Sequence, residues 1–225
     1  MWNEFNIKTF PAETIVYRDG VFQPELSTLS DSENILNKYE LPVHIIYVGK
    51  IKGENTLNIN LTARSQPVFL SINTENKFPA FLNIFIKNTG KNSEIRGHII
   101  FKNYSDLGVK IIAEHGSDDT GILLQTKIIG EKDSFSKISG TAIINKGIKN
   151  TKSNIQFGAY SSDNSAKIRI IPSQKISSVP DFAEHSAYMF HGTDAQENYL
   201  RQSGLSGSEI KDILTESFMN DFNLF

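Results

Sequence analysis

The 225-residue sequence contains no cysteine. Disulfide bonds are therefore excluded, and an oxidising compartment would offer this chain no cross-link. The same absence excludes thiolate ligation of zinc or of an iron–sulfur cluster by this chain, and it excludes a cysteine nucleophile. Any chemistry that the chain takes part in must use other side chains.

Long apolar runs and an excess of basic residues are missing as well. The most apolar short run, Phe81–Ile86, is far shorter than the roughly 20 residues of a membrane helix, and the charged N-terminus lacks the apolar core of a secretory signal. The formal net charge of -2 argues against a general nucleic-acid or anionic-membrane surface. We therefore expect a soluble, cytoplasmic protein that binds neither nucleic acid nor membrane, although this balance still allows a local basic patch.

From Leu41 onward, apolar and polar residues alternate in a series of short segments. Such alternation is typical of strands with one buried face, and examples are Leu57–Ala63, Val68–Ile72, Ile95–Phe101, Ile122–Ile129 and Ile138–Ile144. No helical pattern interrupts the series, so βαβ units are not expected.

A sandwich, a barrel and a β-helix all fit strands at these intervals. Three features favour the β-helix: Ile-rich inward positions, small polar residues between the strands, and few hairpin dipeptides after Gly20. Asn residues that recur along the chain could also form side-chain ladders between coils. We predict a mainly β protein, a right-handed parallel β-helix with a small C-terminal α-helical domain.

The patterns divide the chain into three parts. Residues 1–40 form a short N-terminal lead-in with a hairpin over Ile15–Phe22, because Asp19-Gly20 favours a tight turn. The β-helix core spans residues 41–185. The C-terminal helical domain spans residues 186–225.

Two helices are expected in the tail. Asp194 caps a helix over Ala195–Ser203 that Gly204 ends. Ser206 and Glu209 form the capping box of a second helix. The second helix carries an apolar stripe that either packs on the β-domain or docks a partner, and packing within the chain is the more common use; its members are Ile210, Ile213, Leu214, Phe218 and Phe222.

Few residues are candidates for chemistry. His185 lies where strands give way to helices, and an imidazole there can ligate iron or transfer a proton, or can simply be a half-buried structural residue. Glu184 and His191 are near in sequence but lack a recognised metal spacing. The cluster Glu114–Asp119 could supply carboxylates to a metal, but a polar turn between strands needs the same residues, and we favour the turn.

Motifs for ATP hydrolysis and for two common hydrolase mechanisms are absent. The sequence has no phosphate-binding loop, no G-x-S-x-G elbow and no HExxH pair. We do not expect the chain itself to hydrolyse ATP.

Three stretches carry a resemblance to a known family. Pro172, His185 and Tyr199–Phe218 resemble the C-terminal signature of the SufB/SufD family of iron–sulfur cluster assembly proteins. Ile144–Ser153 and Ile15–Ser27 resemble two further segments of that family, the second of them from its SufD branch. The resemblance covers most of the chain, and residues 172–218 carry its most specific part.

The resemblance implies a β-helix with a helical tail, and a non-catalytic scaffold subunit of a SufBCD-type complex. In the family, the β-helix pairs with a SufB-like subunit, and the tail docks a SufC-like ABC ATPase, which hydrolyses ATP. The resemblance places His185 at the SufB interface as a candidate metal ligand. A transient iron–sulfur cluster is assembled there, and no cofactor is intrinsic to this chain. The implied ATPase-docking residues are Tyr199, Leu200, Ile210, Ile213, Leu214 and Phe218.

Departures from the family pattern point to the SufD branch. SufB proteins have a sulfur-accepting cysteine and a Glu directly after the signature His, whereas this chain has no cysteine and has Ser186 there. Gln202 or Ser203 stands where the signature has Arg. The family has a long N-terminal helical region, and residues 1–40 are too few to form it. We therefore interpret the chain as a short SufD.

Two other functions compete with this one. A β-helix polysaccharide lyase or hydrolase would need clustered acidic residues in a groove, and Asp118, Asp119 and Asp163 are the candidates. A structural β-solenoid that associates with itself, for example as a homodimer, would need no site chemistry at all.

Overall fold

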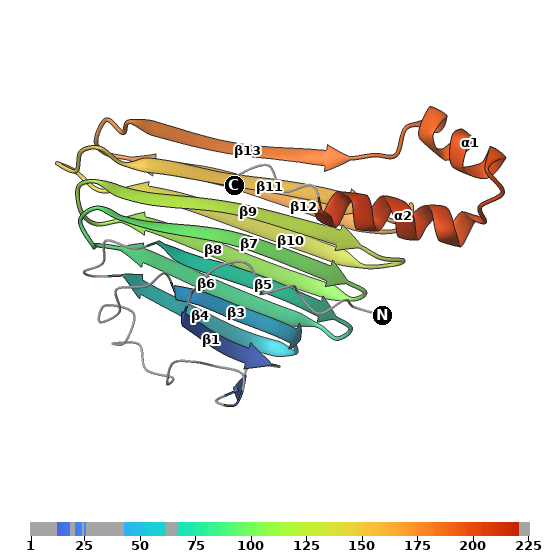
Figure 1. The fold of residues 1–225 in the computed structure, drawn as a ribbon, viewed down its shortest axis with the longest axis horizontal. Helices are drawn as coiled ribbons and strands as arrows, with labels where there is room; N and C mark the ends of the chain where they lie inside the picture. The colour runs from blue at the N-terminus through green and yellow to red at the C-terminus, as the bar shows by residue number, and fades with distance from the viewer. Residues whose placement is uncertain (1–12, 19–20, 24, 26–42, 62–66, 221–225) are drawn as a thin grey trace.

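The structure is a computed structural model that describes residues 13–18, 21–23, 25, 43–61 and 67–220. The described part consists mainly of strands, followed by two helices (Figure 1). No helix in these ranges is long and apolar enough to cross a membrane.

Thirteen strands form two sheets. Sheet A contains the odd-numbered strands and β2: β1 (Glu13–Arg18), β2 (Val21–Phe22), β3 (Val43–Lys50), β5 (Val68–Asn76), β7 (Ser93–Asn103), β9 (Thr120–Gly130), β11 (Lys152–Ser161) and β13 (Phe182–Phe190). Sheet B contains β4 (Gly53–Leu61), β6 (Ala80–Asn88), β8 (Asp106–His115), β10 (Phe135–Ile144) and β12 (Lys167–Ile176).

From β3 onward, consecutive strands alternate between the sheets, and each pairs in parallel with the strand two positions along. This pattern is a β-solenoid of about 5 turns, as Figure 1 shows. The β-helix prediction is therefore confirmed, and the sandwich and the barrel are excluded.

Alternation of side chains builds the core of the solenoid. On β5 the residues are buried and half-buried in turn, and the buried ones face the opposite sheet. Glycine makes room for a large core side chain at one place: a Cβ on Gly140 would lie 2.1 Å from Cζ of Phe157, which is itself fully buried. Stacked coils thus share one continuous apolar core.

Buried asparagines connect successive coils at one corner. Asn76 Nδ2 donates to Asn103 Oδ1 at 2.8 Å, and Asn103 Nδ2 donates to Ser136 Oγ at 2.7 Å in the next coil. All three side chains are inaccessible to solvent. The expected side-chain ladder is therefore present.

A histidine occupies a similar buried position at the other corner. His115 follows Asn88 in register, is 0% exposed, and has its Nδ1 2.9 Å from Thr120 Oγ1. Burial lowers its pKa from 6.5 to about 4. The folded chain therefore holds this imidazole neutral at pH 7.

Acid should destabilise the fold through His115. Because the unfolded imidazole takes up a proton near pH 6.5 and the folded one only near pH 4, its contribution to stability is complete above pH 6.5. It is lost as the pH falls toward 4, by about 3 kcal/mol. We expect urea midpoints to fall over this range in the wild type and to fall less in His115→Asn. His191→Asn, at an exposed position, serves as control; equal pH slopes in wild type and His115→Asn would contradict the assignment.

The expected domain boundaries differ from the structure at both ends. The hairpin around residues 19–20 is confirmed, since Tyr17 pairs with Phe22 and Arg18 with Val21. However, β1 also pairs in parallel with β3, so the lead-in contributes a strand to sheet A. At the other end β13 continues to Phe190, past the expected boundary at residue 185, because Ala187 and Met189 continue the alternation of the strand.

Two helices follow β13. Helix α1 (Asp194–Gln202) begins after Thr193, whose hydroxyl accepts from the Gln196 amide, so the predicted cap at Asp194 was one residue too late. Helix α2 (Gly207–Asn220) has the predicted capping box: the Ser206 amide donates to Glu209 Oε2 at 2.8 Å. Gly204, with φ of +86°, lies between the helices as expected.

Candidate functional site

The C-terminal end of the solenoid exposes the inner positions of its last coil. Strands β12 and β13 are the last of their sheets, and no described strand pairs with their outer edges (Figure 1). Ile168 and Ile170 on β12 are only partly buried, and Met189 on β13 is 46% exposed. The core of the solenoid is thus left open at this end.

His185 lies in the middle of β13 at this open end. It is in register with Ile155, a fully buried core residue, so its side chain faces the inside of the coil. Its ring centroid is 5.6 Å from that of Phe157 below it. The small side chains of Ala183 and Ala187 occupy the inward positions on either side.

The His185 imidazole has no hydrogen-bond partner of normal geometry among the described residues, although both ring nitrogens are shielded from solvent. Burial lowers its pKa, and the main chain of Ser173 on β12 opposes this effect only in part. The imidazole is therefore neutral at pH 7 and carries a free lone pair. Such a nitrogen can accept a proton or bind a metal ion.

The described part of the chain does not surround His185 with a set of metal ligands. Among the described residues, no group of three or more His, Asp or Glu side chains is arranged to hold a metal ion. Glu184 is next to His185 on the strand and therefore points to the opposite face, and His191 is exposed in the segment before α1.

Residues 116–119 form the corner between β8 and β9, as we favoured, while Glu114 and His115 are the last residues of β8. Glu114 Oε1 accepts from Asn145 Nδ2 at 2.9 Å on the outer face, while His115 is buried in the core. Asp118 and Asp119 accept hydrogen bonds from Lys149 and Asn150 of the next coil. These residues connect coils and do not converge on one point.

The six predicted ATPase-docking residues fall into two groups. Ile210, Leu214 and Phe218 are at most 7% exposed and pack against the outer face of sheet A. Tyr199 is 69% exposed and Ile213 is 40% exposed, while Leu200 is half-buried. The stripe on α2 thus mainly packs within the chain, and Phe222 lies outside the described residues.

A buried lysine fixes the end of α2 on sheet A. Lys127 is 0% exposed on the outer face of β9, and its Nζ donates to the Phe218 carbonyl oxygen at 2.6 Å. The same Nζ lies 5.2 Å from the centroid of the Phe218 ring. A cation is favourable at this place because the carbonyl groups of the last turn carry the negative end of the helix dipole.

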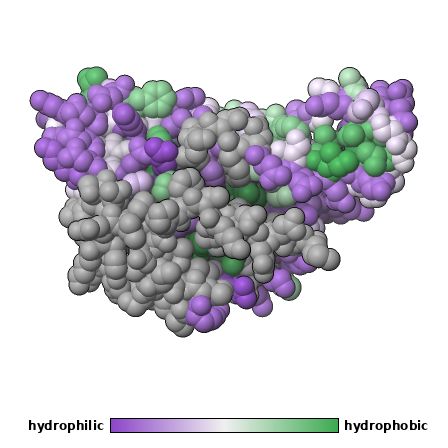
Figure 2. All heavy atoms as spheres, viewed as in Figure 1, coloured by the Kyte–Doolittle hydropathy of each residue, from purple (hydrophilic) through white to green (hydrophobic). Residues whose placement is uncertain are grey.

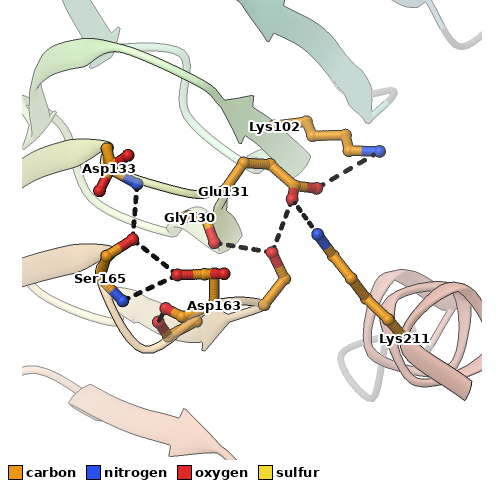
Figure 3. Close-up of polar contacts among 9 residues, drawn as sticks. Lys102, Gly130, Glu131, Asp133, Asp163, Ser165 and Lys211 are labelled. Carbon is orange, nitrogen blue, oxygen red and sulfur yellow. Dashed lines mark hydrogen bonds and ion pairs between the residues drawn. The ribbon is translucent and has the colours of Figure 1, made fainter. Parts of the chain in front are cut away.

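A carboxylate fixes the beginning of α2. Glu131, in the corner after β9, accepts from Lys211 Nζ at 2.6 Å and from Ser162 Oγ at 2.7 Å, and Lys102 Nζ lies 3.5 Å away (Figure 3). Burial alone would raise the pKa of Glu131, but these hydrogen bonds and the two lysine charges lower it. Helix α2 is therefore attached at both ends by charged groups that sequence reasoning did not identify.

The acidic residues of the glycan hypothesis lie in separate places. Asp118 and Asp119 are in the corner between β8 and β9, whereas Asp163 is in the corner between β11 and β12, at the other end of the strands. A hollow of about 330 Å³ near Asp119 also contains Glu94 and Asp181. Two of its three carboxylates already have partners in the chain, Arg96 for Glu94 and Lys91 for Asp119. These ion pairs at the corner of the solenoid account for two of the carboxylates in the hollow.

The candidate site is the open end around His185, together with the exposed side of the helical hairpin, the pair of helices α1 and α2. No protein-family model matches the chain, and no curated protein matches its sequence, so these comparisons do not assign the chain to a family.

Proposed function

We propose that the chain is a SufD-like scaffold subunit of iron–sulfur cluster assembly, which pairs with a SufB-like subunit and docks a SufC-like ATPase. The proposal rests on the resemblance of residues 172–218 to the SufB/SufD signature. The observation that carries it is the position of His185 at the open end of the solenoid.

The open end has the properties of a pairing surface. Strands β12 and β13 each leave one edge of backbone N–H and C=O groups without a strand partner in the described chain, and such edges readily pair with another chain. Exposed apolar side chains lie beside them: Ile176 is 41% and Phe182 is 45% exposed. A second β-solenoid stacked on this end would continue both sheets and cover the core.

His185 would then lie between the two subunits. The cluster itself is cargo, and its thiolate ligands would have to come from the partner, since this chain has no cysteine. A neutral imidazole could bind iron transiently or accept a proton while sulfide is delivered. The role of His185 is therefore a supporting one.

The helical hairpin provides the proposed ATPase-docking surface, with fewer residues than the six that the resemblance implies. Ile210, Leu214 and Phe218 hold α2 on sheet A, which leaves Tyr199, Leu200 and Ile213 for a partner. Figure 2 shows hydrophobic atoms at the surface of this hairpin, surrounded by hydrophilic ones. An apolar centre with a polar rim is the usual composition of a protein interface.

Substitution of His185 tests the proposal. His185→Ala should leave co-purification with the SufB-like and SufC-like partners unchanged, because the strand edges and hairpin remain. It should lower the iron and sulfide bound per complex several-fold, because a ligand or proton acceptor is lost at the assembly point. Iron and sulfide analysis and the visible absorbance of the reconstituted complex measure this.

His191→Ala is the matched control, since His191 is exposed and follows the strand. Equal cluster content in wild type and His185→Ala would remove His185 from the mechanism. Failure of the partners to co-purify, with a homodimer as the sole assembly, would favour the structural, self-associating protein instead.

A further inference from the structure

The outer face of sheet B carries five cationic side chains on its last three strands, and four of them lie near one another, away from Lys175 at the end of β12. Lys137 on β10 is in register with Arg169 on β12, and Lys167 is in register with Phe135. Lys110 on β8 lies one strand away from Lys137 and two residues further along. Since neighbouring strands are about 4.8 Å apart and two residues span about 6.7 Å, each of these positions is within roughly 8 Å of another. We call Lys110, Phe135, Lys137, Lys167 and Arg169 the basic patch.

The chain does not neutralise this patch. All four cationic residues are exposed, and within the described ranges none of them forms an ion pair. Asp106, in register with Phe135, is the carboxylate at the near end of β8, and Glu114 lies four residues beyond Lys110 on the same strand. The patch thus concentrates positive charge in a chain whose formal net charge is -2, which is the arrangement that attracts an acidic partner.

Two exposed phenylalanines lie on the same face. Phe135 is 43% and Phe81 is 41% exposed. The Phe81 ring lies across Gly108, where a Cβ would be only 2.4 Å from Phe81 Cδ2. Gly108 is in register with Lys137, so this ring borders the basic patch. Aromatic rings and arginine are the residues most enriched in the buried centres of protein interfaces.

The face has the size of a protein interface. Five strands of nine or ten residues expose roughly 800 Å² of sheet, which equals one side of a standard protein–protein interface. Glu54 and Glu114 lie on this face too, outside the basic patch, and Lys87 pairs with Glu114, so a partner that covers the whole face meets charges of both signs. A folded partner can place basic groups against the two glutamates and carboxylates against the patch.

We propose that the outer face of sheet B docks a folded acidic protein through the basic patch, with Asp and Glu carboxylates of the partner on Lys110, Lys137, Lys167 and Arg169. Phe135 and Phe81 supply the apolar contact. Lys167 and Arg169 are on β12, so this surface adjoins the open end, but it uses outward side chains and not the strand edge and does not depend on the proposed function.

Binding of fluorescent poly-L-glutamate to the full chain at low salt tests this, with a single-stranded dT20 oligonucleotide and vesicles containing 30% phosphatidylserine as competing probes. Poly-L-glutamate should bind most tightly, and added salt should weaken it. The variant K137Q/R169Q should lower its affinity about tenfold, and Phe135→Ser about threefold. The control K146Q/K149Q removes two exposed charges from the corner between β10 and β11 and should have no effect.

Each other result would overturn the proposal. Tighter binding of dT20 or of vesicles, lost in K137Q/R169Q, would assign the patch to nucleic acid or membrane. Equal affinities in K137Q/R169Q and K146Q/K149Q, or no binding of poly-L-glutamate at all, would show that the patch is an ordinary solvated face. Circular dichroism of each variant verifies that it is folded.

Discussion

Replacing Phe218 with alanine is expected to release helix α2 from sheet A while the solenoid remains folded. Phe218 is 1% exposed, and its ring centroid is 5.3 Å from that of Phe190 and 5.9 Å from that of Tyr160. Truncating a buried Phe to Ala costs about 3–5 kcal/mol. Because α1 contains no buried residue, the hairpin has few other contacts with which to retain its position.

Hydrogen exchange measures this release directly. A loss of about 3–5 kcal/mol should increase the exchange rate of α2 amides by at least about 100-fold, whereas amides of the central strands should keep their protection. The matched control is Ile213→Ala on the same helix, since Ile213 is 40% exposed, and it should change α2 exchange by less than about fivefold. Unchanged α2 protection in Phe218→Ala would mean that Lys127, Glu131 and the remaining apolar contacts suffice to hold the helix.

This pair of variants also separates docking from folding in the proposed function. Loss of ATPase binding in Phe218→Ala would follow from a displaced helix and would not place Phe218 in the interface. Loss of binding in Ile213→Ala, with α2 still protected, would place the exposed side of α2 in contact with the partner.

The solenoid could be predicted from sequence because its signal is local and repeated. Each strand alternates apolar and polar residues, and the same inward positions recur in every coil, so errors at one strand do not change the fold. Asparagines such as Asn76 and Asn103 add a second repeated signal at the corner. The pairing of β1 with β3 was not predictable in this way, because the hairpin signal of β1 and β2 gives no indication of a second, parallel partner for β1.

The placement of the helices could be predicted only in part. The stripe of α2 indicated an apolar face, but it could not show that Ile213 would remain exposed while Leu214, its neighbour, was buried. That difference depends on how the helix is oriented on sheet A. The orientation depends on Lys127, whose partner Phe218 is 91 residues away in sequence, and on Glu131, whose partner Lys211 is 80 residues away.

One local signal could have identified Lys127. It is the one charged residue of Ile122–Ile129, a stretch with apolar residues at both ends, and it lies at an outward position, which is unusual on a face that is buried. His185 was identified by resemblance, and its sequence surroundings did not reveal that it faces the open end. That property follows from its register with Ile155, which only the paired sheet defines.

Replacing Asn103 with leucine should destabilise the solenoid more than any surface change. The two protons of Asn103 Nδ2 are shared among Ser105 O at 2.8 Å, Phe135 O at 3.1 Å and Ser136 Oγ at 2.7 Å, and its Oδ1 accepts from Asn76 Nδ2. Leucine has a similar volume but leaves these groups buried without a partner. Each unsatisfied group costs about 1–3 kcal/mol, and we expect a total loss of about 3–5 kcal/mol in urea unfolding, equal to a fall in Tm of roughly 10 °C.

Asn55→Leu is the matched control, because Asn55 Nδ2 makes its hydrogen bonds to Lys52 O and Gly53 O at a solvent-exposed corner. Water can satisfy those carbonyl groups, so its loss should stay below about 1 kcal/mol. If Asn103→Leu proves as stable as Asn55→Leu, the isoleucine core alone holds the coils in register and the ladder contributes little. If the expected difference appears, the double variant N76L/N103L should lose less free energy of unfolding than the sum of the two single variants. Asn76 and Asn103 share one hydrogen bond, and the first leucine already breaks it.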